Sequence, residues 1–196
     1  EYLIGGGSRL VQLDKKEGCV TKSIPAPDGG QITEVAQIGD LLYALIITES
    51  GMGLYRTEIL KDDGIWHNEI PDQHKYIQNL TVNGRSLCFT SDLDGLVNSY
   101  IYHPDLKLMR KLTNSRFGAK YPHIDNDSGR LYWADFGLKG YHPVSAPLDS
   151  LDWRVADFDE PFVNGIAEHL SRQAKLNTEP LSEEENAALK ARIDSL

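Results

Sequence analysis

The chain has 196 residues, of which 40% are hydrophobic and 25% charged, and its 20 basic and 29 acidic residues give a net charge of −9. This composition is ordinary for a globular protein and excludes a disordered, collagen-like or disulfide-framed chain. The acidic balance argues against a nucleic-acid partner, which would be expected to face a basic stripe. The longest apolar block, Leu41–Ile47, is as short as a strand, so no membrane-spanning helix is expected.

Three short apolar segments open the chain and predict strands at Tyr2–Ile4, Ser8–Leu13 and Cys19–Ile24. They align with the last three strands of the longer units that follow. The first strand of this N-terminal unit is therefore expected to be missing. The two cysteines, Cys19 and Cys88, form no Cys-x-x-Cys pair, and we expect two free, half-buried thiols rather than a zinc site or a disulfide.

A repeat of about 45 residues organises the chain as far as residue 157. Its first landmark is a turn glycine before an apolar strand, found at Gly39, Gly84 and Gly129. Its second landmark is a tyrosine that opens the next strand, found at Tyr55, Tyr100 and Tyr141. Because the landmarks recur in the same phase, each period is interpreted as one structural unit.

Each unit contains short apolar segments separated by turn residues, such as the hairpin signal Asn83-Gly84. The second unit predicts strands at 32–37, 41–48, 54–60 and 65–70. The third predicts strands at 76–82, 85–91, 98–103 and 107–113, and the fourth at 119–124, 131–135, 141–147 and 153–157. Four strands in this period are what one blade of a β-propeller requires, and mid-strand aromatics such as Phe89 and Trp133 are expected between blades.

The pattern changes to a helical one after Asp157. Ile166, Leu170 and Ala174 recur at four-residue steps, and a capping box at Ser182–Glu185 predicts a second helix. The predicted fold is therefore all-β: a β-propeller, incomplete or four-bladed, with a C-terminal helical extension or linker. Its predicted parts are a partial first blade (1–25), three blades (30–71, 75–115 and 119–157), and the extension (158–196).

The best-matching unit contains a turn glycine, an apolar strand, an Asp-Gly turn, a tyrosine strand and a closing Leu-Thr. These residues are Gly84, Leu87–Asp92, Asp94-Gly95, Tyr100 and Leu112-Thr113, and the fourth unit shares Asp125, Gly129, Leu131–Trp133 and Gly140-Tyr141. Over residues 30–156 the chain resembles the TolB-like β-propeller repeats. Leu112–Ala119 and Trp153 also resemble large cell-envelope proteins of Bacteroidetes. This resemblance implies a fragment of a larger protein with an extracytoplasmic, periplasmic or outer-membrane-associated location.

No motif in the sequence assigns a reaction, so no enzyme, cofactor or metal is predicted. Asp92–Gly95 and Asp125–Gly129 lack the further ligands of a calcium loop and are interpreted as turns, with a bound cation as the alternative. There is no Gly-x-Ser-x-Gly elbow and no histidine pair at ligand spacing. A pair of glycosidase carboxylates contributed by different blades is an alternative that the sequence leaves open, because no spacing rule singles out such a pair.

Propellers commonly bind partners on the face that carries the loops between blades and between second and third strands. The residues predicted to bind there are His74, Tyr76, Asp92, Asp94, Arg116, Phe117 and Tyr121. Exposed aromatic residues and arginine are typical of interaction hot spots, although ordinary loop residues are the simpler interpretation.

The expected function is a non-enzymatic interaction module of the cell envelope that binds a protein or a glycan. The alternative is a propeller that gates substrate for a serine peptidase of the prolyl-oligopeptidase or tricorn type, with the catalytic domain outside this chain. An unpaired edge of the partial blade would also invite association with another chain. A closed four-bladed ring, in which Pro161–Val163 supplies the missing first strand, is a further possibility.

Overall fold

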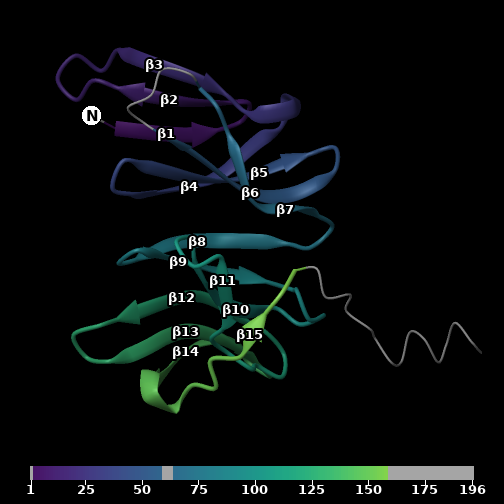
Figure 1. Ribbon diagram of the computed structural model, residues 1–196. Coiled ribbons are helices and arrows are strands. Elements are labelled where there is room, and N and C mark those ends of the chain that lie inside the picture. The colour runs from purple at the N-terminus through teal and green to yellow at the C-terminus, as the bar shows by residue number, and fades with distance from the viewer. Residues whose placement is uncertain (1, 59–63, 159–196) are drawn as a thin grey trace, which may run out of the picture. The chain divides into compact units, whose positions relative to one another are not determined.

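Four antiparallel sheets follow one another along the chain in a computed structural model that describes residues 2–58 and 64–158 (Figure 1). The first sheet contains β1 (Tyr2–Gly6), β2 (Arg9–Leu13) and β3 (Val20–Pro25), and the second contains β4 (Gln31–Ile38), β5 (Leu41–Thr48), β6 (Gly51–Glu58) and β7 (His67–Gln73). The third contains β8 (Ile77–Asn83), β9 (Ser86–Ser91), β10 (Asn98–His103), β11 (Leu108–Lys111) and β15 (Val155–Ala156), and the fourth contains β12 (Ala119–Asp125), β13 (Arg130–Gly137) and β14 (Gly140–Pro147).

Two short 3₁₀ turns, Pro27–Gly29 and Leu148–Ser150, join these strands. The all-β propeller prediction is confirmed, and the predicted C-terminal helices lie outside the described residues. No helix among the described residues is long and apolar enough to cross a membrane.

The turn glycines start tight hairpins, as the sequence predicts. Gly39 and Gly84 each occupy the first position of a two-residue loop and have a φ of 58°. This left-handed conformation is strained for a residue with a side chain, which explains the glycines. The predicted hairpin at Asn83-Gly84 forms with its loop one residue later, because Asn83 still pairs with Ser86.

The sheets are held together through their faces. Leu45 and Leu54 of the second sheet share one buried cluster with Leu87, Phe89 and Tyr100 of the third. Because side chains alternate across a strand, the neighbouring positions of β5 point the other way and pack on the first sheet. Each inner sheet therefore has two apolar faces, and the inter-blade position predicted for Phe89 is confirmed.

A carboxylate also joins the second sheet to the third. Glu34 of β4 accepts hydrogen bonds from the backbone N–H groups of Asn79 (2.9 Å) and Leu80 (2.6 Å) in β8. The register of β8 shifts at this point, and Asn79 has a φ of 58°, so the strand contains a β-bulge. Glu34 thus satisfies N–H groups that the bulge removes from the regular ladder.

The first sheet corrects one prediction, because the missing strand is the outer one rather than the first. β1 lies against β4 just as β4 lies against β8, so β1 occupies the innermost position of its blade. The β1–β2 hairpin also repeats the glycine loop of the later blades, with Gly7 at a φ of 64°. Where an outer strand would follow, the indole N–H of Trp66 donates to the carbonyl oxygen of Pro25 at 2.7 Å.

The last strand corrects a second prediction. The sequence places 153–157 in the fourth blade, but β15 pairs with Met109 and Arg110 of β11 in the third sheet (Figure 1). Pro143 and Pro147 lie in β14, and proline has no N–H to donate to a further strand. Within the described residues β14 is therefore an edge strand, while the short β11 pairs with the returning chain.

We predict that Phe89→Ala lowers the free energy of unfolding by about 3–5 kcal/mol, because it removes a large, fully buried ring between two sheets. Urea denaturation followed by circular dichroism measures the change. The fully exposed Leu138 is the matched control, and Leu138→Ala should alter stability by less than about 0.5 kcal/mol. Equal effects of the two substitutions would contradict the assignment of Phe89 to the core.

The two cysteines are both free, as predicted, but they differ in exposure rather than being half-buried alike. Burial raises the pKa of the Cys88 thiol to about 12, so its reactive thiolate is scarce at any lower pH. We predict that a disulfide reagent labels the exposed Cys19 in the native protein and labels Cys88 only after unfolding. Rapid labelling of both thiols under native conditions would show that β9 is accessible.

Candidate functional site

The loops predicted to form the binding face are connected by backbone hydrogen bonds. The N–H of Ala119 donates to the carbonyl oxygen of Val97 at 2.7 Å, and the N–H of Phe136 donates to that of Gly118 at 2.8 Å. These bonds join loop 92–97, loop 114–118 and the end of β13. Side chains from two blades are therefore held at one end of the third and fourth sheets.

A buried polar network positions loop 114–118. The amide oxygen of Asn98 accepts hydrogen bonds from the hydroxyl of Thr113 (3.0 Å) and the N–H of Ser115 (2.8 Å). The Thr113 hydroxyl in turn accepts the N–H of Ser99 at 2.9 Å, and the Ser115 hydroxyl accepts the N–H of Gly118 at 3.0 Å. The network shapes the loop so that Arg116 and Phe117 are exposed.

Exposed rings and cations gather at this end of the sheets. The Lys120 ammonium lies 5.8 Å from the ring centroids of both Tyr76 and Tyr141, within cation–π range. The Tyr141 ring packs against Phe136 with centroids 4.9 Å apart, and the Arg116 guanidinium lies 5.6 Å from the Phe117 ring. We name this group the loop-face patch: Tyr76, Arg116, Phe117, Lys120, Phe136 and Tyr141.

The two predicted carboxylates, Asp92 and Asp94, are engaged within the chain. Asp92 accepts the backbone N–H of Tyr76 at 2.8 Å, which holds two loops together. Asp94 pairs with Lys111 and accepts the hydroxyl of Tyr100 at 3.3 Å. Burial, followed by the nearby Asp94 charge, raises the pKa of the Tyr100 phenol, so the hydroxyl remains a donor. Both carboxylates brace the face in this structure.

The structure separates the remaining predicted residues. His74 is exposed on the loop between β7 and β8. Tyr121, also exposed, has a φ of 57° and lies with Tyr132 and Tyr141 in a hollow of about 320 Å³ on the fourth sheet. Tyr76, Arg116 and Phe117 belong to the loop-face patch, whereas Tyr121 belongs to the face of the sheet beside it.

Lys120, Phe136 and Tyr141 were absent from the predicted binding residues. Tyr141 is a landmark of the repeat, and its counterparts Tyr55 and Tyr100 are only 6% and 1% exposed, so the pattern indicates a core residue. In the structure Tyr141 is 48% exposed. The aromatic content of 136–141 was the available signal. Tyr55 and Tyr100 pair with the fourth residues of β5 and β9, whereas Tyr141 pairs with Phe136, the seventh residue of β13, so Tyr141 faces the opposite side of its sheet.

The turn interpretation of Asp125–Gly129 is confirmed. The Asp125 carboxylate accepts the N–H of Asp127 at 3.0 Å and the hydroxyl of Ser128 at 2.6 Å. These hydrogen bonds, led by those from Ser128, lower the pKa of the Asp125 carboxyl. Within residues 2–58 and 64–158, no group of three or more His, Cys, Asp or Glu side chains is placed to hold a metal ion.

One serine–histidine pair lies away from the patch. The Ser86 hydroxyl and the Nδ1 atom of His103 are 2.6 Å apart, at the end of β9 opposite to loop 92–97. Burial, with a smaller effect of Arg110, lowers the pKa of the His103 imidazole. Since the Ser86 side chain is buried, the pair is best explained as a hydrogen bond between the ends of β9 and β10.

We predict that Asn98→Ala lowers the free energy of unfolding by about 1–3 kcal/mol, because it leaves the buried hydroxyl of Thr113 and the partly buried N–H of Ser115 without their acceptor. Hydrogen exchange should also accelerate at the amides of Ser115 and Gly118. The control Thr113→Ser keeps the hydroxyl and should leave exchange in this loop nearly unchanged. Unchanged exchange in Asn98→Ala would show that the network does not hold the loop.

Comparisons with known proteins support the fold. No protein-family model matches the chain, and neither does any curated protein sequence. A crystal structure of a nidogen/laminin complex is similar over 78% of this chain and 59% of that chain, with 17% identity and a TM-score of 0.55. A putative TolB from Agrobacterium tumefaciens is similar over 79% of this chain and 57% of that chain, with 14% identity and a TM-score of 0.57.

A puromycin-hydrolyzing peptidase from Mycobacterium tuberculosis is similar over 76% of this chain but only 24% of that chain, with 10% identity and a TM-score of 0.55. The chain thus spans less than three fifths of the length of each of these structures. Likeness at this level of identity concerns the fold alone. It agrees with the repeat and the stacked sheets, and the chain is a β-propeller module.

Proposed function

We propose that the chain is a non-enzymatic interaction module that binds a protein or a glycan on its loop face. One observation carries this proposal: among the described residues, all exposed aromatic side chains lie between Tyr76 and Tyr141, and four of them belong to the loop-face patch. Single exposed apolar residues are normal on a protein surface, but a group of rings beside cations marks an interaction surface.

The chemistry of the patch suits binding rather than catalysis. Aromatic rings offer rigid apolar area at a small entropic cost, and arginine adds directed hydrogen bonds. Phe117 and Arg116 are both exposed, while Lys120 is already held between two rings. A partner with planar or apolar groups and acceptor oxygens would complement these side chains, as both peptides and saccharides do.

We place this function in the bacterial cell envelope, in the periplasm or at the outer membrane. The proposal rests on the sequence resemblance to TolB-like repeats and to Bacteroidetes envelope proteins, and on the structural similarity to a putative TolB. Further domains of the same protein would then present the propeller to its partner.

A second candidate function is substrate gating for a serine peptidase. The similarity to a puromycin-hydrolyzing peptidase favours it, since this chain corresponds to about a quarter of that one. In that case the catalytic residues would belong to a separate domain. A Gly-x-Ser-x-Gly motif in a neighbouring domain of the parent protein would support this function over the first.

The test places a photo-crosslinking phenylalanine at position 117, inside the patch, or at the exposed Val20 of the first sheet as control. Exposed to an envelope extract, the protein should crosslink to a defined partner through position 117 and not through position 20. An array of envelope glycans probes the saccharide alternative. Equal crosslinking at the two positions, together with no glycan binding, would overturn the proposal.

We further predict that Phe117→Ala weakens binding to the partner or glycan so identified by about tenfold or more, as expected for a hot-spot ring. Val20→Ala is the matched control and should bind normally. Because the Phe117 side chain is exposed, its truncation should leave the urea midpoint unchanged. Turnover of peptide or glycoside substrates by the purified chain would contradict the non-enzymatic assignment.

A further inference from the structure

The fourth sheet has one covered face and one open face. Leu131 and Trp133 of β13 pack on the third sheet, so Tyr132 and Phe136, which alternate with them, face away. Phe136 pairs with Tyr141 of β14, which places three rings on the same side. We name this side the open face: Tyr121, Tyr132, Ala134, Phe136, Tyr141 and Pro143, of which Phe136 and Tyr141 also belong to the loop-face patch.

The equivalent face is a sheet-to-sheet interface twice within this chain. Tyr43, Cys88 and Tyr132 each occupy the third position after the hairpin loop that precedes their strand. Tyr43 and Cys88, which the next sheet covers, are only 2% and 1% exposed, whereas Tyr132 is 40% exposed. Continuity with these two interfaces indicates that the open face is built to receive another sheet.

The open face is rich in partly exposed tyrosines. Tyr121, Tyr132 and Tyr141 are 60%, 40% and 48% exposed, whereas Tyr43, at the position equivalent to Tyr132, is buried with Leu45 and Leu54 between two sheets. Tyrosine is enriched at interfaces between separately folded molecules, where one part of the ring is buried and the hydroxyl stays hydrated. The open face therefore suits a partner that folds by itself and then associates.

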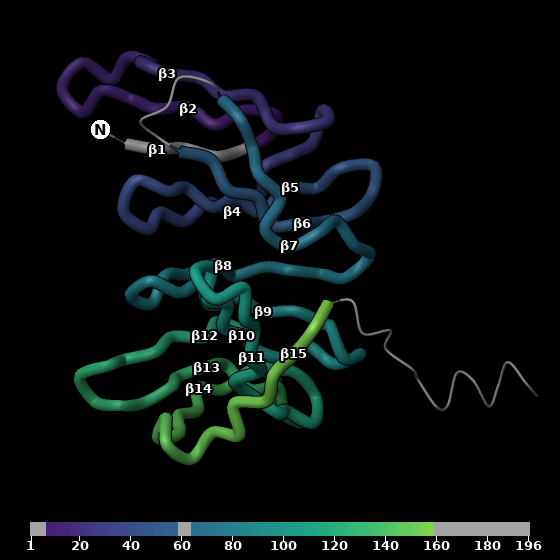
Figure 2. The backbone as a smooth tube through the Cα atoms, in the orientation of Figure 1, coloured from purple at the N-terminus to yellow at the C-terminus, as the bar shows by residue number. Residues whose placement is uncertain are grey.

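The first sheet offers the matching surface. Leu10 and Ile24 pack on the second sheet, so the alternate residues Arg9, Val11 and Ser23 face the opposite way. Arg9 is exposed, and its Nε atom donates to the Ser23 hydroxyl at 2.7 Å. A guanidinium held in this way can stack on tyrosine rings. Figure 2 shows the first and fourth sheets at opposite ends of the stack of sheets.

We infer that the open face of the fourth sheet binds the first sheet of a second copy of this chain, and that two copies associate reciprocally. Each fourth sheet then covers the partner's first sheet, in the same order as the sheets within one chain. Four sheets from each copy give a ring at the upper end of the range of about 4–8 blades found in closed propellers. In a closed, symmetric dimer, the first and fourth sheets of each copy would both be covered by sheets of the partner.

Sedimentation velocity of the full chain over a wide concentration range tests the inference, and we expect a monomer–dimer equilibrium. Tyr132→Lys in the open face and Arg9→Glu in the first sheet should each raise the dimer dissociation constant by about tenfold or more. Leu106→Lys, at an exposed loop position, is the control and should dimerise normally. Circular dichroism and the urea midpoint should confirm that each variant is folded.

Mixing the two variants gives the sharpest readout. In the mixture, one of the two contacts joins unaltered surfaces, and the other brings the introduced lysine opposite the introduced glutamate. The mixture should therefore dimerise more tightly than either variant alone. The inference is overturned if the wild-type chain stays monomeric, if Tyr132→Lys dimerises normally, or if Arg9→Glu has no effect, which would indicate pairing of two open faces.

Discussion

The requirement that each inner sheet have both of its apolar faces covered governs this molecule. Sheets with alternating inward and outward apolar positions, such as Leu42 and Tyr43 of β5, cannot be stable alone, because one face would remain in water. The repeat meets this requirement because each successive sheet packs against the one before it and covers its exposed apolar face. Within the described residues no further sheet packs on the fourth one, and its aromatic rings are exposed there.

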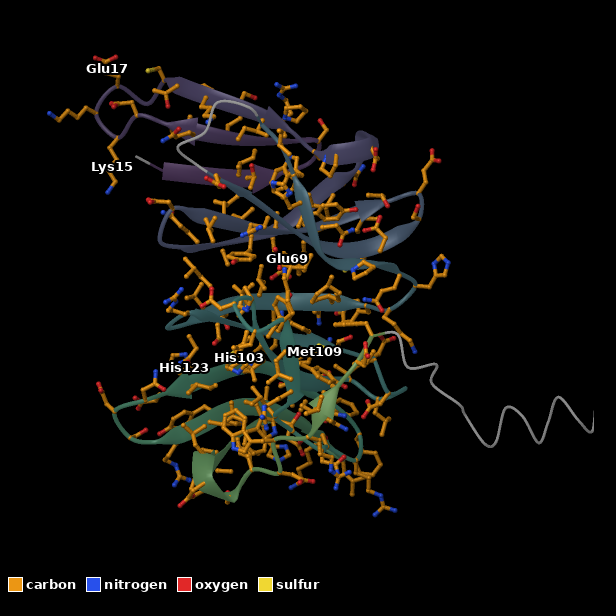
Figure 3. The ribbon with its side chains drawn as sticks, in the orientation of Figure 1. Lys15, Glu17, Glu69, His103, Met109 and His123 are labelled. Carbon is orange, nitrogen blue, oxygen red and sulfur yellow. The ribbon has the colours of Figure 1, made fainter. Side chains whose placement is uncertain are left out.

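Polar contacts add directional constraints to the apolar packing between the sheets. Burial of apolar surface is non-directional, whereas hydrogen bonds require a defined distance and angle. Glu34 binds two consecutive N–H groups of β8, and Asn98 binds two donors, Thr113 and Ser115, from the segment that follows β11. Figure 3 shows Glu69 between the second and third sheets; its buried carboxylate pairs with Arg56 at 3.0 Å and with Lys107. The Asn98 contacts hold the loop that carries Arg116 and Phe117, and the Glu34 contacts tie the second sheet to the third.

The sequence predicts local features of this fold well and long-range pairing poorly. Gly84 and Phe89 were interpreted correctly, because a turn glycine and a mid-strand aromatic depend on the strand period alone. The partner of β15 depends on prolines in another strand and on a free edge elsewhere, which no local pattern encodes. The candidate site shows the same division. Phe117 lies on the expected loop, whereas Tyr141 is out of phase with Tyr55 and Tyr100 and faces the opposite side of its sheet.

The return of β15 to the third sheet has a consequence for the order of folding. This sheet combines residues 77–111 with Val155–Ala156, so its last strand is synthesised only after the whole of the fourth sheet. A ribosome adds about 5–20 residues each second, and the edge of β11 therefore stays unpaired for seconds during translation. Pairing across such a sequence separation also slows folding, because a long loop must close before the contact forms. The third and fourth sheets thus mature together, as one cooperative unit rather than as two successive blades.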